Sequence, residues 1–158
     1  MKYLVMLILL ASPIFAFAAE PIQTQTLNEG IHVLSGNGGN ILVIAGDDGV
    51  VIVDDKFAED SEEIKNAISG LGGGPVKFVL NTHWHQDHTG GNINFADTAV
   101  IISHANVRKR LESDQFIEFF NKTVKASPKQ ALPVVVFDES IGLRFNDHEI
   151  NVSHLPAG

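Results

Sequence analysis

Residues 81–92 read NTHWHQDHTGGN, and this stretch decides the fold and the chemistry that the chain can support. It holds three of the chain's seven histidines, His83, His85 and His88, together with Asp87. Residues two apart in an extended segment point the same way, so His83 and His85 can bind one cation together. Asp87 and His88 are adjacent, and a curling loop could give this second pair to another cation.

Two other interpretations of this loop are weaker. A polar loop can carry histidines that only form hydrogen bonds, but four ligand-type side chains within six positions favour a metal site. A continuous helix would also bring His83 and Asp87 onto one face, but Gly90 and Gly91 follow at once and disfavour it. The chain has no cysteine, and imidazole and carboxylate are the ligands that zinc takes without thiolate.

The surrounding segments predict an α/β fold. Residues 76–80 are an apolar run, which predicts a buried strand whose carboxyl end carries the loop, where α/β sheets usually place their sites. A helix is expected at 61–69, with Ser61 as its N-cap. Strands are expected at residues 23–27, 31–35, 40–45, 50–53, 99–103, 134–137, 141–145 and 149–154, and further helices at 105–112 and 115–125. Early hairpins and later alternation of strands with helices indicate a sheet with an antiparallel portion.

The N-terminus and the composition bear on location and partners. Lys2, the apolar run at 3–11 and the small residues Ala16 and Ala18 predict a cleaved secretory signal over residues 1–18, with a retained membrane anchor as the alternative. The expected location is the periplasm or the outside of the cell, with no membrane contact after cleavage. A net charge of −8 disfavours nucleic acid as a partner.

The pattern His83-x-His85-x-Asp87-His88, followed by TGGN at 89–92, resembles the signature loop of the metallo-β-lactamase superfamily. The resemblance implies that His83 and His85 hold a first zinc ion and that Asp87 and His88 hold a second. Asp87 would also orient the nucleophile and so act as the catalytic residue. Iron is the alternative metal, because redox relatives with the same loop use it.

The resemblance reaches beyond the ligands. Residues 50–54 resemble the family's strand that ends in an aspartate near the metals, so Asp54 is expected to support a ligand from behind, with pairing to Lys56 as the alternative. Thr89 and Asn92 are expected either to orient ligands in the same way or to cap the next helix.

The implied fold is the family's αββα sandwich of two similar halves. This chain would cover the first half and the start of the second, which makes residues 19–158 an incomplete metallo-β-lactamase-like domain. Residues 149–158 resemble the lead-in to a Gly-His-Thr-like turn that carries the next ligand, so the remaining ligands are expected beyond Gly158.

For the whole protein, the resemblance implies an exported zinc-dependent hydrolase that acts on a small-molecule substrate. The leading substrate class is a cyclic amide such as a β-lactam, attacked by a metal-bound hydroxide. The alternatives are another hydrolase of this fold, such as a thioesterase or lactonase, and a truncated non-catalytic fragment. The 158-residue chain itself is expected to be inactive, because it holds only part of each metal shell.

Overall fold

The computed structural model describes residues 20–156, so the expected signal at residues 1–18 lies outside the described residues. A seven-stranded sheet in the order β1-β2-β3-β4-β5-β6-β9 forms its centre. The strands from β1 to β4 pair antiparallel, whereas β4, β5, β6 and β9 run parallel. Their bounds are β1 Gln23–Asn28, β2 Ile31–Ser35, β3 Ile41–Gly46, β4 Gly49–Val53, β5 Val76–Asn81, β6 Val100–His104 and β9 Val135–Phe137.

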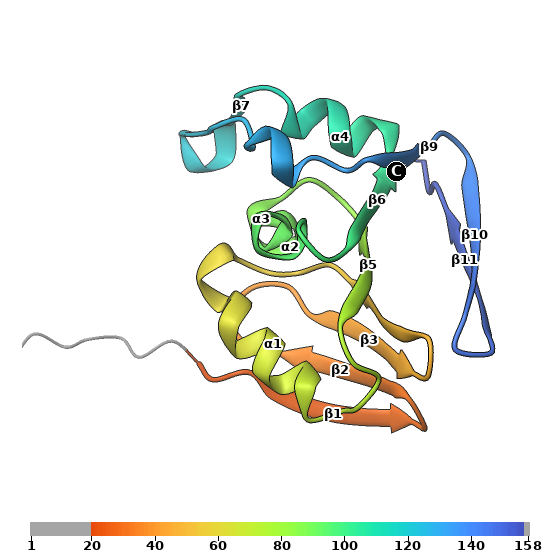
Figure 1. Cartoon of the computed structure of the whole chain (residues 1–158). Coiled ribbons are helices and arrows are strands. Elements are labelled where there is room, and N and C mark those ends of the chain that lie inside the picture. The colour runs from red at the N-terminus through yellow and green to blue at the C-terminus, as the bar shows by residue number, and fades with distance from the viewer. Residues whose placement is uncertain (1–19, 157–158) are drawn as a thin grey trace, which may run out of the picture.

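Helices cover one face of this sheet, and a two-stranded hairpin covers the other (Figure 1). The α-helices are α1 Ser61–Ser69, α2 Gln86–Thr89, α3 Asn92–Phe95 and α4 Ala105–Leu111. Short 3-10 helices lie at η1 Ala58–Asp60, η2 Glu118–Phe120 and η3 Lys129–Ala131. The covering hairpin is β10 Ser140–Phe145 with β11 His148–Ser153, and a separate hairpin is β7 Gln115–Ile117 with β8 Lys122–Val124.

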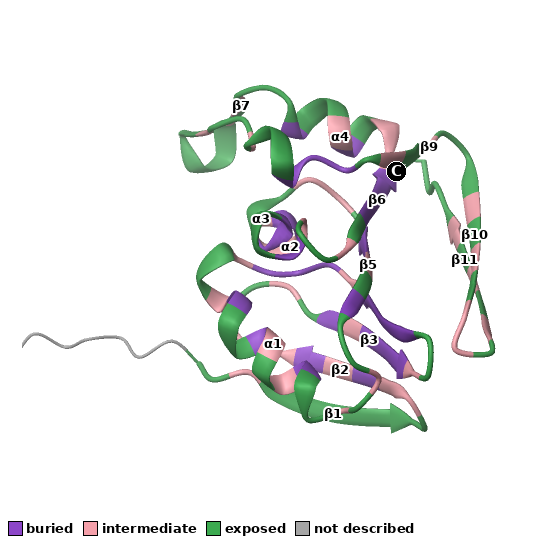
Figure 2. Ribbon diagram, in the orientation of Figure 1, coloured by how far each residue is buried: buried purple, intermediate pink, exposed green. Residues whose placement is uncertain are grey.

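The central strands are apolar on both faces because both faces are covered. In β4, Val50 and Ile52 pack with α1 and α3, whereas Val51 packs on the opposite side with the β10–β11 hairpin. Buried residues therefore concentrate in the middle of the sheet, and β1 at its edge is exposed along its length (Figure 2). The α/β class predicted from the sequence is confirmed.

One predicted element is wrong. Residues 115–125 were expected to form a helix, but they form the β7–β8 hairpin around η2. Asn121 has a left-handed backbone with φ 47°, which ends η2 and starts the return strand. The segment is rich in aromatic and β-branched residues, and its short apolar runs fit a strand as well as a helix, so their periodicity alone cannot decide between the two.

Helix α1 spans the predicted residues but begins differently. Asp60 occupies the N-cap position, and no side chain caps the helix there. Ser61 is its first residue and is buried, and its Oγ accepts a hydrogen bond of 2.8 Å from Asn94 Nδ2. Ser61 therefore joins α1 to α3 and is not the N-cap. None of the described helices is both long and apolar enough to cross a membrane.

The turn of the β10–β11 hairpin is fastened to the turn between β3 and β4. Asp48 N donates to Asn146 Oδ1 at 2.9 Å, and Asn146 N donates to Asp48 Oδ2 at 2.7 Å. Asn146 Nδ2 also donates to Gly49 O at 3.0 Å. This reciprocal set of bonds, here called the turn latch, joins segments about a hundred residues apart and fixes the hairpin over the sheet.

The turn latch can be tested with Asn146→Gly, which removes two side-chain hydrogen bonds but tolerates the left-handed backbone, φ 52°. We expect the free energy of unfolding to fall by about 1–2 kcal/mol in urea titrations. Asp147→Gly is the matched control, because Asp147 has φ 60° and its side chain makes no hydrogen bond within residues 20–156. If both variants lose the same free energy of unfolding, the loss comes from the added flexibility of glycine and the side-chain hydrogen bonds of Asn146 do not stabilise the fold.

Candidate metal centre

The loop of residues 81–92, the metal loop, starts at the carboxyl end of β5, beside the carboxyl end of β4. Asp54 follows β4 directly, and its backbone N–H donates to Leu80 O at 2.9 Å. Because parallel strands end at one edge, residues after β4 and β5 meet although some 30 positions separate them in sequence. The sequence predicted that the loop of residues 81–92 starts at this edge, and the structure places it there.

The Asp54 carboxylate holds both ends of the metal loop. Its Oδ1 accepts from Thr82 N at 2.7 Å, and its Oδ2 accepts from Thr82 Oγ1 at 2.7 Å. Oδ2 also lies 2.7 Å from His88 Nδ1. Asp54 is only 4% exposed, so these bonds form away from bulk water. The alternative partner Lys56 is engaged elsewhere, because its amine donates to Gly39 O.

This arrangement sets the orientation of His88. A carboxylate only accepts hydrogen bonds, so Nδ1 of His88 carries the hydrogen and Nε2 is left as the acceptor. Nε2 faces Asp87, whose Oδ2 lies 3.3 Å away. A carboxylate that fixes the tautomer of a ligating histidine in this manner is common in metal sites. Nε2 of His88 and Oδ2 of Asp87, the two atoms that could bind a metal ion, therefore lie side by side.

His83 and His85 complete the cluster. The ring centroid of His83 lies 4.8 Å from that of His85 and 4.0 Å from that of His88. One donor atom from each of Asp54, His83 and His88 falls within 4.8 Å of the others. Burial, and then the nearby His88 and His85, lower the pKa of His83, which favours the neutral imidazole that metal binding requires.

The donor set fits a metal ion of the zinc type. The rings of His83, His85 and His88 and the carboxylate of Asp87 lie beside one another in a chain without cysteine, and such nitrogen and oxygen ligands suit zinc. Among residues 20–156, the one group of three such side chains whose ligand atoms lie within 4.8 Å of one another is Asp54, His83 and His88, so the structure does not bring His85 or Asp87 into that group. Since the oxygens of Asp54 already accept three hydrogen bonds, we assign Asp54 to orienting Thr82 and His88.

Asp55, which the sequence did not single out, and Lys56, expected only as an alternative partner of Asp54, also pack against the metal loop. Asp55 N donates to His88 O at 3.1 Å, and its Oδ1 accepts from Gly91 N at 2.9 Å. Both side chains are fully buried, and burial raises the pKa of Asp55 and lowers that of Lys56. The only sign of their role in the sequence is that three charged residues in a row follow the apolar strand at residues 50–53.

Glycines let two segments approach the metal loop closely. A Cβ on Gly91 would lie 2.5 Å from Asp55 O, so only glycine fits beneath the loop. A Cβ on Gly39 would lie 2.5 Å from Cε1 of His88. The glycine-rich segment at 36–39 therefore covers the ring of His88, and the Lys56 amine holds it there through Gly39 O.

Thr89 and Asn92 support the metal loop and do not cap the next helix. Thr89 Oγ1 donates to His85 O at 3.0 Å. Asn92 is completely buried, and its Nδ2 donates to Asn81 Oδ1 at 2.9 Å and to Ala131 O at 3.0 Å. No side chain caps α3. Of the two roles considered, the structure favours positioning of the loop that carries the ligands.

Comparison with known proteins identifies the family. The model described as "Metallo-beta-lactamase superfamily" matches residues 34–157. The chain belongs to the metallo-β-lactamase superfamily, a fold family of metal-dependent hydrolases. The resemblance seen in the metal loop is thereby confirmed. No curated protein gives a significant match to the chain.

Solved structures share this fold at low sequence identity. A subclass B3 metallo-β-lactamase of Bradyrhizobium japonicum is 24% identical with a TM-score of 0.67, and the match covers 82% of this chain and 50% of that one. A class B3 di-zinc metallo-β-lactamase from an Alaskan soil metagenome is 18% identical with a TM-score of 0.70, covering 87% and 53%. The chain spans about half the length of these structures, as expected for the first half of the fold.

Asp54→Asn tests the role of the buried carboxylate. An amide cannot accept from Thr82 and His88 with both of its terminal atoms, so His88 loses its fixed orientation. We expect zinc affinity, measured by competition with a chromogenic chelator, to fall about 10- to 100-fold. Asp97→Asn is the control, because Asp97 is exposed and remote from the loop. An unchanged zinc affinity in Asp54→Asn would show that Asp54 does not support the metal ligands.

Gly39→Ala tests the close approach over His88. The added methyl group would contact the His88 ring and Asp87 O, so either the ring or the covering segment must move. We expect zinc affinity to fall about tenfold or more in the same competition assay. Gly70→Ala is the matched control, since its Cβ would meet only Ala67 O at 3.4 Å. A fall of the same size in both variants would contradict a specific effect.

Proposed function

We propose that this chain is part of an exported zinc-dependent hydrolase that opens a cyclic amide such as a β-lactam. The observation that carries the proposal is that His83, His85, Asp87 and His88 lie beside one another at one sheet edge, with Asp54 hydrogen-bonded to His88. The B3 metallo-β-lactamases with the same fold support the substrate class. The expected signal at residues 1–18 supports export, to the periplasm or the outside.

In this proposal, His83 and His85 bind a first zinc ion, and Asp87 and His88 bind a second. Zinc held there would lower the pKa of water and polarise a carbonyl, which is the chemistry of a hydrolase. Burial lowers the pKa of His83, which favours the neutral ring that binds a metal ion. Asp87 orients the attacking water, while Asp54 keeps His88 in the tautomer that leaves Nε2 free.

We further propose that residues beyond Gly158 supply the remaining ligands. Within the chain, each predicted metal has only two of its ligands, and zinc sites in proteins ordinarily have three or four. The signal at 1–18 and an incomplete domain at 19–158 are part of the same proposal. The 158-residue chain alone would then bind zinc weakly and turn over no substrate efficiently.

Zinc content and nitrocefin hydrolysis, measured on this chain and on the full gene product, test the proposal. We expect the full product to bind about two zinc ions and to hydrolyse nitrocefin, and the chain alone to do neither efficiently. In the full product, Asp87→Ala should lower turnover by about two to four orders of magnitude.

The other results are equally informative. Zinc binding without nitrocefin hydrolysis would move the substrate to an ester, thioester or lactone while keeping the metal assignment. Iron in place of zinc, found in the same metal analysis, would indicate a redox relative. A full product without bound metal would contradict the assignment of the metal loop.

A further inference from the structure

Two of the three histidines of the metal loop are oriented by hydrogen bonds. Nδ1 of His88 is held by the Asp54 carboxylate. The Thr82 hydroxyl donates its hydrogen to Asp54, so it accepts from Nδ1 of His83 at 3.0 Å. In both rings Nε2 is thereby left free. A histidine that binds a metal ion almost always has a hydrogen-bond partner of this kind on its second nitrogen.

His85 is held in a different way. Among residues 20–156, only its backbone oxygen takes part in hydrogen bonds, and its imidazole makes none. The ring instead meets two other rings edge to face, with centroid distances of 4.6 Å to Trp84 and 4.8 Å to His83. His83 is itself expected to bind the same metal ion, so Trp84 is the neighbour that can act as a support for His85.

A cavity leaves His85 without support on one side. Its volume is about 330 Å³, and both His85 and Trp84 line it. Ile117 and Lys122, which are paired across the β7–β8 hairpin, line it as well. Open space, and not packed protein, therefore lies against part of the His85 ring. The orientation of this ring depends on its contact with Trp84.

Trp84 is in turn fixed by α4 and the segment after η3. Its ring packs on the buried cluster of Val107, Leu111 and Leu132. The guanidinium carbon of Arg110 lies over the Trp84 ring, 5.2 Å from its centroid, which is within the range of a cation–π contact. The indole is therefore held by apolar packing and by a cation from the same helix.

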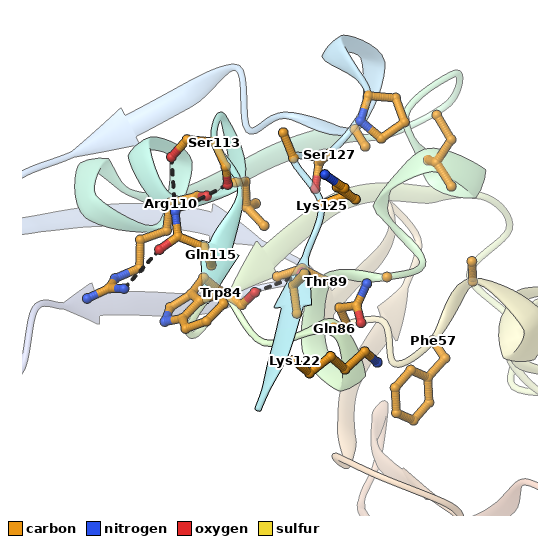
Figure 3. A pocket seen from close by; sticks show the side chains of 18 of the residues that line it. Phe57, Trp84, Gln86, Thr89, Arg110, Ser113, Gln115, Lys122, Lys125 and Ser127 are labelled. Carbon is orange, nitrogen blue, oxygen red and sulfur yellow. Dashed lines mark hydrogen bonds between the residues drawn. The ribbon is translucent and has the colours of Figure 1, made fainter. Parts of the chain in front are cut away.

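Gln115 keeps the guanidinium in place beside Trp84 (Figure 3). Arg110 Nη1 donates to Gln115 Oε1 at 3.2 Å, and Gln115 Nε2 donates back to Arg110 O at 3.1 Å. Gln115 Nε2 also donates to Ser113 Oγ at 3.0 Å. An exposed arginine usually samples many rotamers, and these bonds restrict it to the one that covers the indole.

We propose that Trp84, held by Arg110, is the positioning residue for His85. The contact between the two rings keeps the imidazole of His85 beside that of His83, so that both can bind the first metal ion. The proposal rests on the proposed function in one respect, namely that His85 binds this ion. Arg110, which lies outside the metal loop, thereby acts on the centre through Trp84 and without touching the metal.

The first test uses the metal-free full gene product at one fixed pH. Arg110→Met keeps the stem of the side chain and removes the guanidinium, so the indole is less firmly held. We expect the ring signals of His85 in 1H–13C NMR spectra, assigned by their loss in His85→Gln, to shift while those of His88 stay in place. Lys109→Met is the matched control, because it removes the same charge from the next exposed position of α4. It should leave both sets of signals unchanged.

The second test measures zinc binding to the full product by competition with a chromogenic chelator. Arg110→Met should weaken one of the two zinc-binding steps about two- to fivefold, as the loss of one exposed cation–π contact does, and leave the other within about twofold. Trp84→Leu keeps an apolar side chain but no ring, and it should weaken the same step about tenfold. Trp84→Phe restores a ring beside His85 and should recover most of that loss.

Unmoved His85 signals in Arg110→Met, or an equal loss at both zinc-binding steps, would overturn the proposal. So would a Trp84→Phe variant that binds zinc as weakly as Trp84→Leu, because lost packing alone explains that result. A full product that binds no zinc contradicts the proposed function instead. The NMR comparison of metal-free protein then decides by itself whether Arg110 orients His85.

Discussion

The Asp54 carboxylate is the interaction on which the rest of the centre depends. It accepts hydrogen bonds from Thr82 at the start of the metal loop and from His88 near its end, so one buried group closes the loop. Its charge is stabilised by three donors, which is what makes a carboxylate at 4% exposure tolerable. Because His88 is held by Nδ1, its Nε2 and the carboxylate of Asp87 face one volume. The Asp54 side chain thus brings the predicted metal ligands His88 and Asp87 into a fixed arrangement.

The sheet makes this interaction possible. Asp54 and Thr82 meet because β4 and β5 are parallel neighbours that end at the same edge. The metal loop then turns back under β4, where Gly91 N donates to Asp55 and Gly39 covers His88 from the other side. Asp54 and Lys56 both adopt left-handed backbones, with φ 64° and 57°, in the turn that leaves β4. Strained residues next to a site persist only when their surroundings hold them, and here the buried bonds of Asp54 do so.

The sequence predicted the parts of this structure that local pattern determines. The apolar run before residue 81 and the histidine spacing after it located both β5 and the metal loop, and the resemblance to a family gave Asp54 its place. Asp55 and Lys56 could not be selected in the same way, because their burial depends on Gly91 and Gly39, which approach from distant segments. A helix was predicted at residues 115–125, where the structure has a hairpin, because the short apolar runs fit the period of a strand as well as that of a helix. The pairing of Ile117 with Lys122 depends on the three-dimensional fold of the hairpin. The cavity that this hairpin forms beside His85 could therefore not be predicted from the sequence.

The turn latch has a consequence for how this molecule meets its neighbours. Asp48 and Asn146 fasten the β10–β11 hairpin at one end, and its inner residues pack on the sheet, so it stands as a rigid two-stranded ribbon. Within residues 20–156, neither long edge of that ribbon is paired with a third strand. A strand edge with unpaired backbone donors and acceptors is a template for another strand. That edge is therefore the place where a further strand, from the same polypeptide or from a second copy, would add to the hairpin.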